Sequence, residues 1–81
     1  MLAELFSQPK VVGAKQVKRA IDAGRAQKVF LAADADPRIT ESIASLCVEK
    51  DVPTENDCSM KELGKACGIA VGAAVAALVE Q

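Results

Sequence analysis

Short apolar runs alternate with amphipathic segments along this chain, and the alternation is the feature that most limits its fold. Residues 28–33 form an almost unbroken apolar run of strand length, which predicts a strand buried on both faces. A shorter β-prone run covers residues 10–12, and a weak strand is expected to follow residues 52–54. Residues 71–79 are apolar or glycine at both sets of alternate positions, and valine recurs at every fourth place, which favours a central strand.

Three segments between these runs have helical periodicity. The segment that follows Gly13 repeats its apolar residues at helical spacing and stops at Gly24. The second helix is predicted to run to about residue 50, with Asp36 as its N-cap and proline in its first turn. The third is expected from Ser59, which opens a capping box, to a glycine stop at residue 68.

This element order places the chain in a definite fold class. The succession β-α-β-α-β-α-β, with a short helix allowed before Pro9, predicts an α/β fold whose sheet is covered by helices on both faces. A length of 81 residues leaves room for one domain, which we place at residues 1–81.

The composition excludes several functions. The chain has no histidine, which removes Ser-His-Asp and Cys-His nucleophiles, histidine-ligated zinc and most general-base catalysis near neutral pH. Phe6 and Phe30 are its two aromatic residues, too few for a fold that stacks successive bases on a row of rings. These absences argue against an enzyme, and we expect no cofactor.

The three cysteines are expected to be packing residues. Cys47, Cys58 and Cys67 are separated by gaps of eleven and nine, which fit neither a metal site nor a disulfide framework. Buried thiols of this kind are typical of a reducing cytoplasm. The first six residues lack the pattern of a signal peptide, and the apolar stretch 69–79 is too short to span a bilayer. We therefore expect a cytoplasmic protein with no metal and no membrane partner.

Charge is distributed unevenly along the chain. Residues 1–28 carry six basic and two acidic groups, a balance of +4, whereas residues 29–58 carry two basic and seven acidic groups, a balance of −5. The overall charge of −1 argues against non-specific coating of nucleic acid. An anionic partner is expected to meet the first third of the chain.

The first candidate site is the turn into the first of these helices. Lys15, Gln16 and Arg19 fall within two turns of Gly13, where free N–H groups and the helix dipole suit a phosphate. Lysine and arginine donate to guanine O6 and N7, and glutamine both donates and accepts at a base edge. The alternative is that these residues form the solvated face of an amphipathic helix.

A second candidate is the glycine-rich segment 64–72. If this segment stands out from the fold, Ile69 and Val71 are apolar groups that could pack against an unstacked base. The alternative is that both residues belong to the core, and spacing alone favours that interpretation.

The third candidate is the pair Asp34 and Asp36 behind a buried strand. Paired aspartates at such a place attack phosphate and hold Mg²⁺ in haloacid-dehalogenase-type phosphatases. The alternative is a capping aspartate with a solvated neighbour, and the chain is far shorter than such enzymes.

Together these segments resemble the kink-turn RNA-binding ribosomal proteins of the archaeal L-seven-Ae type, and among them the short bacterial paralogues. The resemblance implies a three-layer α-β-α sandwich with a mixed four-stranded sheet. It also implies binding to a kink-turn, a bent RNA helix with a three-nucleotide bulge beside tandem sheared G·A pairs. The matching segments are residues 12–17, Ala20-Ile21 with Gly24, residues 33–37 and residues 59–74.

The resemblance also assigns roles to residues. Lys15 and Gln16 stand where the family has an Asn-Glu pair at the G·A bases, and Gly13 would allow close approach to phosphate. Arg19 stands at a basic position that reaches guanine or phosphate, with Lys18 and Lys28 as further phosphate contacts. The loop 67–71 would cover the extruded bulge nucleotide. The RNA-binding residues implied are Gly13, Ala14, Lys15, Gln16, Lys18, Arg19, Lys28, Cys67, Gly68, Ile69, Ala70 and Val71.

The resemblance makes Asp34 and Asp36 structural and leaves two functions open. The first is an RNA-binding module whose partner is structured RNA, with ribosomal RNA as one candidate. The second is a protein-interaction or regulatory module that keeps the fold without specific RNA binding, its acidic middle third facing a basic partner. A monomer is expected because the sequence has no exposed apolar stripe.

Overall fold

The computed structural model describes residues 8–80 of the chain. Along these residues four strands alternate with three helices. The short helix allowed before Pro9 lies outside these residues. In chain order the elements are β1 (Lys10–Val12), α2 (Ala14–Asp22), β2 (Ala26–Ala32), α3 (Pro37–Lys50), β3 (Thr54–Cys58), α4 (Met60–Ala66) and β4 (Val75–Val79).

The strands form one mixed sheet in the order β1-β4-β2-β3. β4 pairs antiparallel with both β1 and β2, while β2 and β3 run parallel. The last strand in the sequence is therefore a central strand, as its apolar residues on both faces predict. All five residues of β4 are buried.

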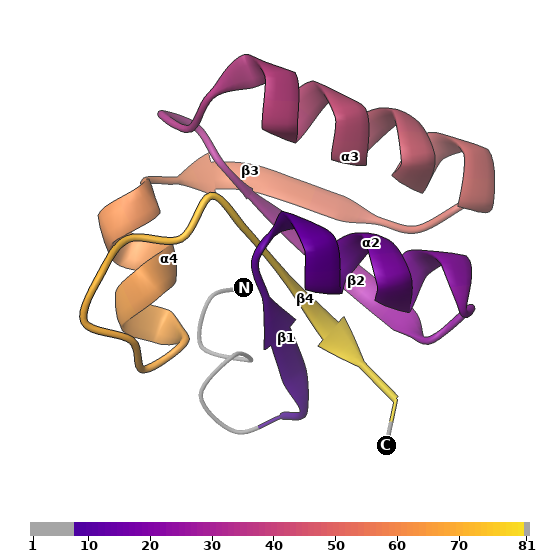
Figure 1. Cartoon of the computed structure of the whole chain (residues 1–81), viewed down its shortest axis with the longest axis horizontal. Coiled ribbons are helices and arrows are strands. Elements are labelled where there is room, and N and C mark those ends of the chain that lie inside the picture. Colours follow the sequence, from indigo (N-terminus) through magenta and orange to yellow (C-terminus); the bar gives the residue numbers. More distant parts are fainter. Residues whose placement is uncertain (1–7, 81) are drawn as a thin grey trace.

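Helices cover both faces of the sheet, which confirms the three-layer α-β-α sandwich. α2 and α3 pack on one face, and α4 packs on the other (Figure 1). Phe30 of β2 and Leu63 of α4 are fully buried in the core between the sheet and α4. Val17 of α2 and Cys47 of α3 are fully buried in the core on the other face. Burial of Val17, Phe30 or Leu63 stabilises the fold by roughly 1.5–3 kcal/mol each.

The beginning of the last strand differs from the sequence prediction. Residues 71–79 are predicted as strand, but β4 begins at Val75, and residues 71–74 belong to the preceding loop. The loop is attached to α4, because the Ala73 N–H donates to the Met60 carbonyl at 3.0 Å. The backbone rejoins β2 only at Ala74, whose carbonyl accepts from the Ala32 N–H at 2.8 Å, and periodicity alone does not reveal this.

The predicted caps are confirmed. The Asp36 side chain accepts from the Arg38 N–H at the start of α3, with Pro37 in the first turn. Ser59 and Glu62 form a reciprocal capping box at the start of α4. These caps satisfy helix N–H groups that would otherwise have no partner.

The cysteines are packing residues, as expected. All three are free and buried. Burial raises the pKa of each thiol, so each is a protonated and weak nucleophile near neutral pH. Residues 8–80 contain no group of three metal-ligating side chains, and no helix in that range is long and apolar enough to cross a bilayer.

Candidate functional site

Three connections between strands and helices meet at one end of the sheet. The Gly13 N–H, at the turn into α2, donates to the Val75 carbonyl at 3.0 Å, directly after the loop 67–74. In the turn that follows β2, the Asp34 carboxylate accepts from the Met60 N–H at 2.7 Å. We call residues 13–19 together with residues 67–72 the turn-and-loop surface.

The α2 half of this surface combines a free helix start with cations. Gly13 has a φ of 100°, a conformation that favours glycine, and among residues 8–80 no side chain caps α2. The first turn of α2 carries no acidic residue. Its start can therefore receive an anion. Val17, Ala20 and Ile21 are buried, Ala14 is half-buried, and Lys15, Gln16, Lys18 and Arg19 are exposed.

The loop half is held against α4 by a close backbone contact. A Cβ atom at Gly64 would lie 2.3 Å from the Val71 carbonyl oxygen, so the loop occupies the space that a side chain would need. The Ile69 N–H also donates to the Gly64 carbonyl at 3.1 Å. These contacts at Gly64 and the Ala73–Met60 hydrogen bond hold the loop along α4, although the loop contains no helix or strand of its own.

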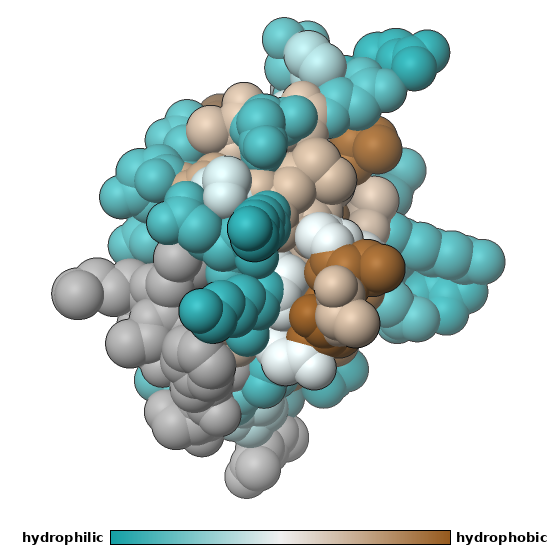
Figure 2. Space-filling model, turned by 90° about the vertical axis from the view of Figure 1, so that its left-hand side faces the viewer, coloured by the Kyte–Doolittle hydropathy of each residue, from teal (hydrophilic) through white to brown (hydrophobic). Residues whose placement is uncertain are grey.

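This arrangement turns two apolar side chains outward. Ile69 is 38% exposed and Val71 is 72% exposed. On this side of the molecule, apolar side chains gather among hydrophilic ones (Figure 2). Spacing alone favours core positions for both residues, and that interpretation is wrong. The exposure fits the loop that the family resemblance implies.

The other loop residues differ in accessibility. Gly68 and Ala70 are exposed, and Gly68 has a φ of 76°, which favours glycine. Cys67 is buried in the core beneath α4, so its side chain cannot form part of a contact surface. Its backbone N–H donates to the Leu63 carbonyl and ends α4. Cys67 therefore anchors the loop.

A cleft beside the loop brings in two cations that the sequence reasoning did not select. Lys61 and Lys65 line it from the exposed side of α4, together with the apolar loop residues. Their spacing of four residues places them on one side of a helix, which is the signal that could have identified them. The cleft of about 550 Å³ is lined by Asp34, Met60, Lys61, Lys65, Ile69, Ala70, Val71 and Gly72.

Lys28 is not brought together with the other site residues. It pairs with Leu78 in the sheet, whereas the turn-and-loop surface lies at the Val75 end of β4. Its Nζ atom forms an ion pair with Glu55 at 2.7 Å and lies 5.4 Å from the centre of the Phe30 ring. These contacts stabilise the face beneath α4.

Asp34 and Asp36 have structural partners. Asp34 accepts from the Met60 N–H, and Asp36 caps α3 and forms an ion pair with Arg38 at 2.8 Å. The Arg38 guanidinium holds the pKa of Asp36 below its ordinary value. Both roles agree with the structural interpretation that the resemblance favours.

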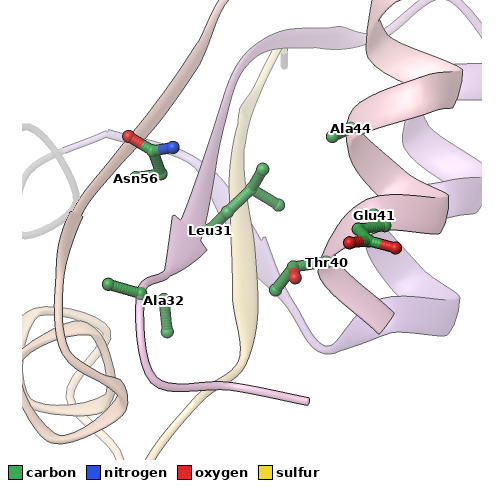
Figure 3. Close-up of a pocket in the computed structure, with 7 residues that line it drawn as sticks. Leu31, Ala32, Thr40, Glu41, Ala44 and Asn56 are labelled. Carbon is green, nitrogen blue, oxygen red and sulfur yellow. The ribbon is translucent and has the colours of Figure 1, made fainter. Parts of the chain in front are cut away.

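A separate cleft lies between α3 and the parallel strands β2 and β3. Figure 3 shows its side chains coming from all three elements. Among the described residues that line it, Glu41 carries the charge, so this cleft does not favour a phosphate. Its lining residues are Leu31, Ala32, Ala33, Thr40, Glu41, Ala44 and Asn56.

The fold and the turn-and-loop surface together define a small α-β-α sandwich with a basic and apolar face beside its central strand. Residues 7–81 match the model of the Ribosomal protein L7Ae/L30e/S12e/Gadd45 family, and the chain belongs to this family.

Bacterial relatives are similar over most of their length. An RNA-binding protein of Geobacillus sp. (strain WCH70) is 48% identical over 69 residues, which cover 85% of this chain and 84% of the relative. The RNA-binding protein YbxF of Geobacillus stearothermophilus is 46% identical over 69 residues, with the same coverage. Among solved structures, the 15.5kD RNA binding protein of Giardia lamblia superposes with a TM-score of 0.87 and 32% identity, covering 99% of this chain and 68% of that one.

Proposed function

We propose that this protein binds structured RNA and stabilises kink-turns, in which tandem sheared G·A pairs lie beside a three-nucleotide bulge. The observation that carries the proposal is the junction of a cationic helix start with an outward-facing apolar loop, tied together by the Gly13–Val75 hydrogen bond. Membership of a family whose relatives are named RNA-binding proteins supports it. Ribosomal RNA is one candidate target, and the protein would act in the cytoplasm. Its proposed role is binding and not catalysis.

The α2 half of the surface would read the G·A pairs. Gln16 and Lys15 are exposed in the first turn of α2, where they can reach base edges in an opened major groove. Arg19 lies one turn further along and can donate to guanine or phosphate. Each good base contact contributes about 1–3 kcal/mol of discrimination.

The loop half would cover a base that has left the stack. Ile69 and Val71 offer apolar surface, and Lys61 and Lys65 line the adjoining cleft, where they can neutralise a neighbouring phosphate. Because the contact with Gly64 holds the loop in place, little ordering entropy is lost on binding.

This combination favours one RNA conformation. A protein that binds the kinked form better than the extended form shifts the population toward the kink, and the shift is limited by the difference in affinity. Few phosphates are contacted, so the salt dependence is expected to be modest.

The test is fluorescence anisotropy with a labelled kink-turn RNA at two salt concentrations. The control RNA has the G·A pairs replaced by Watson–Crick pairs. Tight binding that is lost with the control RNA supports kink recognition. Equal, weak binding to both RNAs that disappears with salt would leave only an electrostatic surface and overturn the proposal.

Matched variants assign the contact residues. Gln16→Ala and Ile69→Asp are each expected to weaken binding at least fivefold, while circular dichroism stays native. Gln27→Ala makes the same change as Gln16→Ala, and Val48→Asp likewise replaces a β-branched apolar residue by aspartate. Both positions are exposed and lie outside the turn-and-loop surface. If the two pairs behave alike, the site assignment is wrong.

A further inference from the structure

A second groove adjoins the turn-and-loop surface on the side away from the loop. It lies between α2 and α3, has a volume of about 360 Å³, and starts at the N-terminal ends of both helices. Ile43 is buried at its base, and Ile39 is 36% exposed beside it. The groove is lined by Ala14, Lys15, Lys18, Arg38, Ile39, Ser42 and Ile43.

Three cations line this groove. Lys15 and Lys18 come from α2, and Arg38 comes from α3. All three are exposed, and the Arg38 side chain is 90% accessible. Arg38 lies in the net-acidic segment 29–58, so the charge distribution along the chain gives no hint that it joins the lysines. Folding therefore places Arg38 of α3 beside the lysines of α2.

Arg38 is held in place by its neighbour. Its Nη2 atom donates to Asp36 Oδ2 at 2.8 Å, and its Nε atom donates to Oδ1 at 3.2 Å. This two-point contact fixes the plane of the guanidinium. The two hydrogens of Nη1 take no part in the contact with Asp36 and can donate to another anion. An oriented guanidinium loses less side-chain entropy when it binds an anion.

We propose that the α2–α3 groove binds the phosphodiester backbone of the RNA strand that continues from the kink, with Arg38 as a phosphate contact. The inference rests on the proposed function, because Lys15 belongs to both surfaces. A polyanion with regularly spaced phosphates matches cations on both sides of a groove, and the partly exposed Ile39 offers apolar contact to the sugars. RNA is favoured over an acidic peptide because the groove is continuous with the turn-and-loop surface.

Two matched pairs of variants test the groove. Arg38→Gln removes a groove cation, and Lys50→Gln removes a cation at the other end of α3. Ser42→Asp adds a negative charge inside the groove, and Ser45→Asp adds one at an exposed position of α3 that does not line it. The serine pair leaves the Asp36–Arg38 contact intact, so it reports on the groove even if the arginine variant disturbs the start of α3.

Affinity is measured against salt with the kink-turn RNA and with its Watson–Crick control. We expect Arg38→Gln to weaken binding three- to tenfold. It should also make the negative slope of log affinity against log salt shallower by about 0.7–0.9, the value for one phosphate contact. Ser42→Asp should weaken binding at least fivefold, whereas Lys50→Gln and Ser45→Asp should change little.

The outcomes separate the two proposals. If wild type distinguishes the RNAs but the groove variants match their controls, the groove does not bind RNA and the proposed function stands. If wild type binds both RNAs alike, the proposed function fails and the groove proposal fails with it as stated; groove variants that still reduce the salt dependence then show a phosphate-binding groove without kink recognition. Binding to neither RNA overturns both, and an acidic partner protein becomes the better candidate for this groove.

Discussion

Replacing Gly64 by alanine should destabilise the protein, although the same change stabilises an ordinary helix. Gly64 lies inside α4, where alanine is favoured over glycine by about 1 kcal/mol per residue. In this helix the new Cβ atom would meet the Val71 carbonyl oxygen at 2.3 Å and the Gly72 Cα atom at 3.0 Å. Both neighbours are backbone atoms, which cannot rotate away as the end of a side chain could.

The cost follows from what must move. Contacts of Cβ atoms below 3.0 Å essentially do not occur, so the Val71 carbonyl must retreat by at least 0.7 Å. Overpacking of this kind costs about 1–3 kcal/mol. The displacement also strains the hydrogen bonds from Ile69 to Gly64 and from Ala73 to Met60, each worth about 0.5–1.5 kcal/mol. The net change is a loss of about 1–3 kcal/mol after the gain in helix propensity.

Thermal unfolding followed by circular dichroism measures this change. In a domain of this size 1 kcal/mol corresponds to about 4–8 °C in Tm, so Gly64→Ala should lower Tm by at least that amount. The displaced loop should also weaken RNA binding about fivefold or more. Ser45→Ala, at an exposed position of α3, is the control for helix propensity and should leave Tm equal or slightly higher. A higher Tm for Gly64→Ala with unchanged affinity would refute the close contact between loop and helix.

Three further changes test other features. Lys28→Gln should lower Tm by a few degrees, because the ion pair with Glu55 is half-buried, and in an anisotropy titration it should affect RNA affinity less than Lys18→Gln. Ser59→Ala removes the cap of α4 and should cost about 0.5–2 kcal/mol in denaturant unfolding. Arg38 lowers the pKa of Asp36, so their contact stabilises the fold above the ordinary pKa and is lost as pH falls through the lowered value. In carbon-13 NMR, Arg38→Gln should raise the Asp36 titration midpoint, and an unchanged midpoint would contradict the contact.

Much of the fold could be predicted from the sequence because local chemistry and tertiary packing agree there. The caps at Asp36 and Ser59 depend on side chains acting within three residues, and the structure has both. The run at residues 28–33 indicates a buried strand, and four residues from Val29 to Ala32 are buried. Strand order could not be predicted in the same way, since it depends on contacts between segments distant in sequence.

The loop before β4 shows where sequence patterns fail. The segment from Val71 onward has the composition of a strand, yet residues 71–74 form a loop that is hydrogen-bonded to α4. The deciding interaction is a backbone contact at Gly64, and a glycine in a helix does not show what occupies the space beside it. Arg38 was missed for a related reason, because its partners in the groove come from a helix about twenty residues earlier.

The position of β4 has a consequence for synthesis. It is the last of the four described strands to leave the ribosome, and it joins β1 to the β2–β3 pair. Until β4 emerges, no strand lies between β1 and β2 to pair with both, and the long-range pairing that completes the sheet cannot begin. The loop that precedes it also lacks its anchor at Val75. A nascent chain that stops short of Val75 therefore holds α2 and its cations but no assembled surface, so RNA capture by this protein follows completion of its strand.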